Sequence, residues 1–367
     1  MFKTNAYENL NQRKWWAAMT EETLDLLKTL SATPGPVGRE KMVQDIIKDH
    51  FKDYCGSFTQ DRLGNVVGTL EGGIKKHYAV VAHADEVGFL VSQIDENGFI
   101  RVKWNTQGHM PDLRLLPGQW VLILTEKGLI PGVFCVTTAH LAGPEGKNRI
   151  PTYEEVFLDT GAQSVADIQE LGINIGDPVI YAAPVERLLN NHVSGKSMDD
   201  RVGLVVMLRV LEQLSKLPKT KRPTVTFVST VMEEMGAKGA AAVAKELDLD
   251  AVFVLDIGLA DDHPGTKGET GISLGKGPIV VIKDSALHYS HDLVQSVIRT
   301  ATKEEIPIQR AVFHSYVTDG VQFASQGQIV AVLAIPCRYS HSSFETVSLL
   351  DIDMTIHLLM NILETSS

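Results

Sequence analysis

The chain has 367 residues, of which 44% are hydrophobic and 22% are charged, and its formal net charge is −11. This composition is typical of a globular protein, and the length favours two domains over one. An acidic surface repels phosphate backbones, so nucleic acid is not expected as a partner. No apolar run reaches the roughly 20 residues of a membrane helix, and residues 1–19 contain no apolar stretch of the kind found in signal peptides.

The three cysteines, Cys55, Cys135 and Cys337, are far apart in the sequence and form no CxxC pair. Their odd number and wide spacing indicate neither a disulfide framework nor a thiolate zinc site. We therefore expect the protein to work in the reducing cytoplasm.

Two helices are predicted near the N-terminus. Leu24, Leu27 and Leu30 recur at helical spacing after a start near Thr20, and a loop rich in proline and glycine over 31–38 ends this helix. The second helix is expected to present one apolar face made of Met42, Val43, Ile46, Ile47 and Phe51.

Four short, unbroken apolar runs follow, and runs of this length are typical of strands buried on both faces of a sheet. They are 78–82 (YAVVA), 225–232 (VTFVSTVM), 251–255 (AVFVL) and 329–335 (IVAVLAI). Helices are predicted over 203–214, 237–246, 291–303 and 348–364. This alternation of strands and helices predicts an α/β fold.

Residues from about 90 to 190 differ from the rest of the chain. Glycine and proline are frequent there, the runs between them are β-rich, and no long amphipathic helix is evident. We expect a β-type domain inserted into the α/β domain.

Polar clusters follow each of the four predicted strands. His83 comes after the first run, Glu233 and Glu234 after the second, Asp256 after the third and His341 shortly after the fourth. A fifth cluster, Asp199-Asp200, precedes the helix predicted from 203. Ligands of open α/β sheets gather at the carboxyl ends of the strands, so these groups should meet at one edge.

Two imidazoles and three carboxylates suit zinc, cobalt or manganese, and two such ions close together need a bridging carboxylate. Each residue also has a simpler explanation. Asp199-Asp200 could cap the following helix, Glu233-Glu234 could be a solvated turn, and His83 could be an ordinary hydrogen-bonded histidine. Four strand ends that all carry metal-binding groups nevertheless favour a metal site.

Six segments together resemble the M42 family of metallo-aminopeptidases, which belongs to the di-zinc exopeptidases. They are AHADEVGF (82–89), KSMDDRVG (196–203), EEMGAKGA (233–240), LDIG (255–258), TDG (318–320) and IPCRYSHSSFE (335–345). The sequence departs from the usual family pattern at Tyr316 to Gly320 and at Lys238, which concerns the substrate pocket and not the proposed ligands.

The resemblance implies a role for each matching residue. His83 and Asp256 would bind one divalent ion, Glu234 and His341 the other, and Asp199 would bridge them, with Zn²⁺ or Co²⁺ as the metal. Glu233 would be the general base for an activated water, and Asp85 would hydrogen-bond the far nitrogen of His83. The Asp199-Asp200 peptide would be cis.

The family fold implies a mixed sheet covered by helices, formed here by residues 1–89 and 192–367, with a β-barrel-like oligomerisation domain at 90–191. The resemblance implies release of N-terminal residues from short peptides by a homo-oligomer, typically of twelve subunits in the family, with no membrane partner. Alternatives are a deacylase or amidase using the same two metals on a small peptide-like metabolite, an endoglucanase-type glycosidase, and a non-catalytic binding subunit. A glycosidase would leave the histidines unexplained, because its chemistry needs two facing carboxylates and no metal pair.

Overall fold

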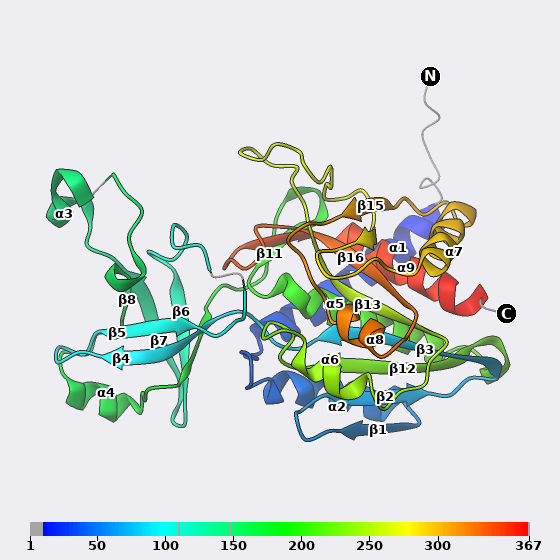
Figure 1. Ribbon diagram of the computed structural model, residues 1–367, viewed down its shortest axis with the longest axis horizontal. Helices are drawn as coiled ribbons and strands as arrows, with labels where there is room; N and C mark the ends of the chain where they lie inside the picture. The colour runs from blue at the N-terminus through cyan, green and yellow to red at the C-terminus, as the bar shows by residue number, and fades with distance from the viewer. Residues whose placement is uncertain (1–9, 109–110, 147, 366–367) are drawn as a thin grey trace.

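The computed structural model describes residues 10–108, 111–146 and 148–365. Two bodies are visible in Figure 1, a larger one built on a mixed sheet and a smaller β-rich one beside it. Each body has its own hydrophobic core. The α/β class and the inserted barrel predicted from the sequence are both confirmed.

The large sheet contains four parallel neighbours at its centre. Its spatial order is β1 (Ser57–Gln60), β2 (Val66–Leu70), β12 (Pro223–Thr230), β3 (Ile74–His83), β13 (Ala251–Leu259), β16 (Val330–Arg338), β17 (Glu345–Ser348), β11 (His192–Gly195) and β10 (Glu186–Arg187). A branch adds β14 (Ile279–Lys283), antiparallel to β16, and β15 (Gln309–Val312), parallel to β14.

The four central strands β12, β3, β13 and β16 coincide with the four apolar runs predicted from the sequence, except that Val231, Met232 and Ile329 lie outside the strands. Eight of the nine residues of β13 and of β16 are buried, and so are the last six residues of β3. Because these strands are covered on both faces, their apolar runs are continuous and do not alternate with polar residues. Their parallel pairing brings their carboxyl ends to one edge of the sheet.

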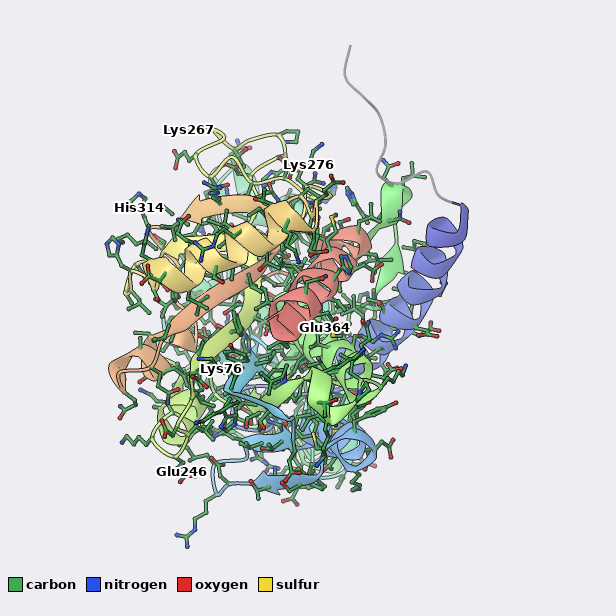
Figure 2. All side chains as sticks on the ribbon, turned by 90° about the vertical axis from the view of Figure 1, so that its right-hand side faces the viewer. Lys76, Glu246, Lys267, Lys276, His314 and Glu364 are labelled. Atoms are coloured by element: carbon green, nitrogen blue, oxygen red, sulfur yellow. The ribbon has the colours of Figure 1, made fainter. Side chains whose placement is uncertain are left out.

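Helices cover this sheet. They are α1 (Leu10–Ala32), α2 (Lys41–Tyr54), α5 (Met198–Ser215), α6 (Lys238–Val243), α7 (His291–Lys303), α8 (Gly320–Ser325) and α9 (Leu349–Thr365). Helix α5 packs on β3 and β13, and α1 and α9 pack on α5. Figure 2 shows α7 and α9 side by side, with charged side chains such as Lys276 and Glu364 near their ends.

Two predictions for the first helices need correction. Helix α1 begins at Leu10 and not near Thr20, because Thr20 and the two glutamates after it continue the helix and do not cap it. In α2, Met42 is 52% exposed, and the buried face consists of Val43, Gln44, Ile47 and Phe51. The polar side chain of Gln44 is tolerated on this buried face because its amide N–H donates a hydrogen bond to the carbonyl oxygen of Ser229.

The smaller body is a closed antiparallel barrel. Its strands run in the order β4 (Phe89–Ile94), β5 (Ile100–Trp104), β8 (Phe157–Asp159), β7 (Gly128–Cys135), β6 (Trp120–Thr125) and β9 (Pro178–Tyr181). Phe89 packs edge-on against Phe134 and Tyr181 in its core. The barrel region also contains two short helices, α3 (Ala139–Gly146) and α4 (Val165–Leu171). No helix in the described part of the chain is long and apolar enough to cross a membrane.

Candidate metal centre

The strand ends bring the predicted ligands together. His83 is the last residue of β3, and the register that pairs Val81 with Val254 puts Asp256 of β13 level with His83. Glu233 and Glu234 lie in the turn after β12, and His341 follows β16. All five predicted ligands and Glu233 meet at one edge, with Asp199 coming from the first turn of α5.

Asp199 lies between the two histidines. Its Oδ1 is 3.1 Å from Nε2 of His83, and its Oδ2 is 3.4 Å from Nε2 of His341. Nε2 of His341 is also 3.3 Å from Oε1 of Glu234. Each oxygen of one carboxylate therefore faces a different imidazole, which is the arrangement of a bridging ligand.

Two groups of donor atoms could each hold one metal ion, with all atoms of a group within 4.8 Å of one another. One group is His83, Asp199 and Asp256, and the other is Asp199, Glu234 and His341, so Asp199 belongs to both. A third group joins Glu233 to His83 and Glu234. By distance alone, Glu233 could therefore also bind a metal ion.

The electrostatics fit a cation at this place. Burial, together with Asp199 and Asp200, raises the pKa of Asp256 well above its usual range. Burial, together with Asp319 and Glu234, likewise raises the pKa of Glu233. A divalent ion would offset this repulsion and favour the charged carboxylates. The nitrogen and oxygen donors are those that zinc and cobalt accept.

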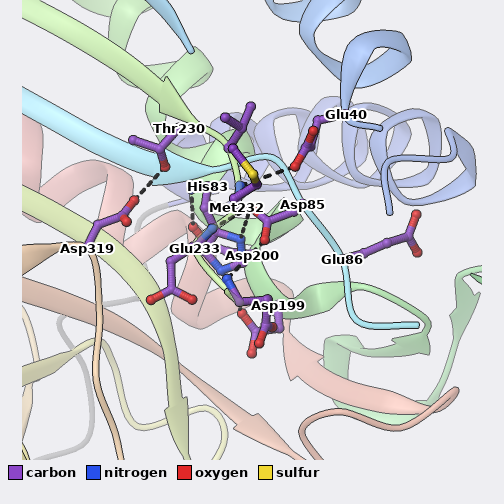
Figure 3. A network of polar contacts seen from close by, with 12 residues as sticks. Glu40, His83, Asp85, Glu86, Asp199, Asp200, Thr230, Met232, Glu233 and Asp319 are labelled. Carbon is purple, nitrogen blue, oxygen red and sulfur yellow. Dashed lines mark hydrogen bonds and ion pairs between the residues drawn. The ribbon is translucent and has the colours of Figure 1, made fainter. Parts of the chain in front are cut away.

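Asp85 holds the turn that carries the two glutamates. Its Oδ1 accepts the backbone N–H of Glu233 at 3.0 Å, and its Oδ2 accepts that of Glu234 at 3.0 Å. The predicted contact with His83 is longer, with 3.5 Å between Oδ1 and Nδ1. Figure 3 shows Asp85 close to Met232 of this turn and to His83. Asp85 therefore positions Glu233 and Glu234 more directly than it positions the imidazole.

The comparisons with known proteins assign the chain to a peptidase family. A family model described as M42 glutamyl aminopeptidase matches residues 64–358, which include all five predicted ligands. The chain belongs to the M42 peptidase family. It is therefore an enzyme of the aminopeptidase class, as the sequence motifs predicted.

Three relatives illustrate the similarity to other M42 proteins. The lysyl aminopeptidase of Pyrococcus furiosus is 32% identical over 346 residues, which cover 93% of this chain and 96% of that protein. An aminopeptidase from the archaeon Desulfurococcus kamchatkensis is 32% identical, with a TM-score of 0.88 over 95% of this chain and 96% of that one. The TET1 peptidase of Pyrococcus horikoshii, described as able to assemble into a tetrahedron or a large octahedral shell, is 29% identical, with a TM-score of 0.84 over 94% and 99% of the two chains.

Asp199 and its neighbour Asp200 take different roles in the M42 site. The peptide bond between them is cis, as the resemblance implied. Asp199 faces the histidines, whereas Asp200 accepts the backbone N–H of Gly203 at 3.0 Å and that of His83 at 3.3 Å. The capping role considered for the pair therefore belongs to Asp200.

Two buried glutamates that the sequence analysis did not single out also hold the M42 site. Glu40 accepts the N–H of Met232 at 3.2 Å, next to the turn held by Asp85. Glu345 accepts the N–H of Asp199 at 3.2 Å and that of His341 at 2.6 Å, so it joins two predicted ligands. Burial, aided by Asp199, raises the pKa of Glu345 to about 8.

A buried ion-pair network lies next to the segment that carries the predicted ligand Asp199. Oε2 of Glu86 accepts from Nζ of Lys196 at 2.6 Å and from the hydroxyl of Ser197 at 2.5 Å, and Oε1 accepts from the guanidinium of Arg201 at 3.4 Å. Burial opposes ionisation, but Lys196 and Arg201 outweigh it and lower the pKa of Glu86. This network fixes the segment that leads into Asp199.

Asp319 of the TDG segment lies beside the catalytic turn (Figure 3). Its Oδ2 accepts the hydroxyl of Thr230 at 2.5 Å, at the end of β12. Burial is the main reason that the pKa of Asp319 rises to about 6. The negative charge of Asp319 also contributes to the raised pKa of Glu233.

A cavity of about 590 Å³ opens over the predicted ligands. Asp199, Glu233, Glu234, Asp256 and His341 all line it. A second cavity of about 660 Å³, between α2 and the barrel, is lined by other residues. The cavity of about 590 Å³ is therefore the one of these two that opens onto the predicted ligands.

Proposed function

We propose that the protein is a metal-dependent aminopeptidase that releases N-terminal residues from short peptides. The observation that carries this proposal is the position of Asp199, whose two oxygens face two separate sets of metal-binding groups. Membership of the M42 family and the relatives named above support a peptidase that acts at a free N-terminus.

We assign His83 and Asp256 to one ion, Glu234 and His341 to the other, and Asp199 to both, with Zn²⁺ or Co²⁺ as the metals. When bound, such a pair lowers the pKa of water toward neutrality and polarises a carbonyl group. The two histidines must be neutral to bind, so their second nitrogens keep their protons.

Glu233 acts as the general base. Its side chain lines the cavity, and its carboxylate lies within 4.8 Å of donor atoms of His83 and Glu234, so it can reach a water molecule held at the ligands. It takes a proton from the attacking water and delivers it to the nitrogen of the leaving peptide. A general base of this kind contributes about 10²–10⁴-fold to the rate.

Adjacent glutamates can serve different purposes because Asp85 holds both backbone amides. The N–H groups of Glu233 and Glu234 bind different oxygens of the same carboxylate. The turn is therefore fixed. Of these two glutamates, Glu234 is the one whose Oε1 lies 3.3 Å from Nε2 of His341. This geometry supports Glu234 as the ligand and leaves Glu233 for the proton transfer.

We further propose a cytoplasmic homo-oligomer in which residues 90–191 form contacts between subunits. The three cysteines are free, as expected in a reducing compartment. The barrel also exposes apolar side chains, with Trp120 63% exposed and Ile175 70% exposed, and exposed large apolar side chains are a feature of protein contact surfaces. The assembly described for the TET1 peptidase supports the same reading.

The test compares a free pentapeptide with its N-acetylated twin, each incubated with protein reloaded with Zn²⁺ or Co²⁺. Mass spectrometry should show stepwise loss of N-terminal residues from the free peptide only. Removal of the acetyl group would instead indicate a deacylase. Inertness toward both peptides, with cleavage of a cello-oligosaccharide, would indicate a glycosidase.

A further inference from the structure

The cavity over the metal ligands has two unlike walls. The first wall comes from the turn after β12 and from the loop before β6, and includes Gln107, Asp112, Leu115 and Gly236. The second wall comes from the end of β13, from the loop after β14 and from the loop before α8. It consists of Ile257, Leu259, Ser285, Ser315, Tyr316 and Val317.

Hydrogen bonds within the second wall fix its shape. The hydroxyl of Tyr316 donates to the carbonyl oxygen of Ile257 at 2.6 Å. The hydroxyl and the N–H of Ser285 donate to the carbonyl oxygen of Tyr316, at 2.7 and 3.0 Å. These polar atoms already have partners, so Leu259 and Val317 supply the apolar surface of the wall, next to the exposed Ser315. Val317 is 44% exposed and contributes part of that surface.

The second wall also lacks positive charge. Among the described residues that line the cavity, none is lysine or arginine. Arg114 is close by, but its Nε lies 2.9 Å from both carboxylate oxygens of Asp112, so that pair is neutral. Lys238 places its ammonium group beside Gly236, on the first wall. A carboxylate on the second wall would therefore be removed from water without a cation to compensate it.

The direction of proton transfer decides which wall the N-terminal side chain meets. Glu233 delivers its proton to the leaving nitrogen, so the leaving peptide lies on the side of Glu233 and Gly236. The N-terminal residue then lies on the other side, beside Asp256 and the adjoining Ile257. This step rests on the proposed function.

We propose that the second wall binds the side chain of the N-terminal residue and makes the enzyme select uncharged, apolar residues over acidic ones. Leucine and similar side chains would cover Leu259 and Val317, beside the buried Ile257. Glutamate would fit the same space but would lose its hydration without gaining an ion pair.

The test measures kcat/KM for the p-nitroanilides of leucine, glutamine, glutamate and lysine with the metal-loaded enzyme. We expect leucine to be the best substrate, at about 100-fold over glutamate. Glutamine should exceed glutamate by about 10-fold, because the two side chains have the same shape and differ in charge. Glutamate or lysine equal to or better than leucine would overturn the proposal while leaving the aminopeptidase function intact. No turnover of any of the four would instead contradict the proposed function.

A matched pair of variants tests whether selectivity against acidic residues arises at the second wall. Val317→Lys adds a cation there and should raise the ratio of kcat/KM for glutamate over glutamine about 10-fold. Val312→Lys makes the same change in β15, where Val312 is 52% exposed and does not line the cavity, and should leave the ratio unchanged. Equal effects in both variants would show that general surface charge controls selectivity, and would contradict a specific role for the wall.

Discussion

Asp85 accepts the backbone N–H of Glu233 with one carboxylate oxygen and the backbone N–H of Glu234 with the other, both at 3.0 Å. One buried side chain therefore sets the directions in which two neighbouring glutamates point. Neutral asparagine could accept only one of these bonds, because its amide nitrogen is a donor. The consequence should appear in both metal binding and catalysis.

We predict that Asp85→Asn lowers metal affinity or kcat by about 10–100-fold, the range for groups that orient metal ligands. Asp95→Asn is a matched control, because Asp95 also accepts two backbone N–H groups, from Asn97 and Phe99 at 2.9 Å, in an exposed hairpin of the barrel. Metal titrations and rates should be measured for both variants. If the two variants behave alike, Asp85 has only a structural role.

Asp199→Ala should lose both metal ions, because Asp199 belongs to both donor groups. Loss of activity should follow at every metal concentration that restores the wild type. The measurement is metal content per chain after gel filtration. Retention of one tightly bound ion would show that Asp199 serves one site only.

The pKa of Glu40 gives a prediction about stability and pH. Burial, reinforced by the charge of Asp85, raises the pKa of Glu40 from 4.5 to about 7. As pH rises from 4.5 to about 7, Glu40 keeps its proton in the folded protein but loses it in the unfolded chain. The contribution of Glu40 to the free energy of unfolding therefore falls over this range. The loss is up to about 3 kcal/mol.

Glu40→Gln should remove this dependence, since glutamine does not titrate yet still offers an oxygen to the N–H of Met232. Denaturant unfolding of the wild type and the variant at pH 5 and pH 8, with the same metal present, measures the difference. The variant should gain stability relative to the wild type at the higher pH. A constant difference between the two proteins would contradict the raised pKa.

The network around Glu86 predicts a large loss of stability. Glu86→Gln would leave Lys196 and Arg201 buried without a counter-charge, which costs about 3–5 kcal/mol. Glu71→Gln is a control, because Glu71 pairs with Lys219 on the surface and its loss should matter little. Chemical denaturation measures the free energy of unfolding of both variants. Similar losses in the two variants would show that the buried network contributes no more to stability than a surface pair.

The same sequence pattern, an apolar run followed by a polar residue, predicted both the central strands and the candidate ligands at their ends. Buried parallel strands have continuous apolar runs, and the polar residue that ends each run must lie at the sheet edge, as His83 and Asp256 do. The start of α1 was missed because Thr20, a residue that often caps helices, also fits inside one. Helix α6 is shorter than the predicted 237–246, since it ends at Val243.

The supporting residues were beyond the reach of pattern analysis. Glu40 and Glu345 bind backbone N–H groups of residues far away in the sequence, and nothing in their local pattern distinguishes them from surface glutamates. Only the fold shows that they are buried beside the ligands. The same holds for the second wall of the cavity, whose residues come from three separate segments.

The central claim is that Glu234 binds metal while its neighbour Glu233 does not. The most direct measurement is the metal content and the turnover rate of Glu233→Gln beside Glu234→Gln. We predict two ions per chain in the wild type and in Glu233→Gln, and a loss of metal in Glu234→Gln. The turnover rate of Glu233→Gln should be at least about 10²-fold below that of the wild type. A drop in metal content in Glu233→Gln, with full occupancy in Glu234→Gln, would contradict it.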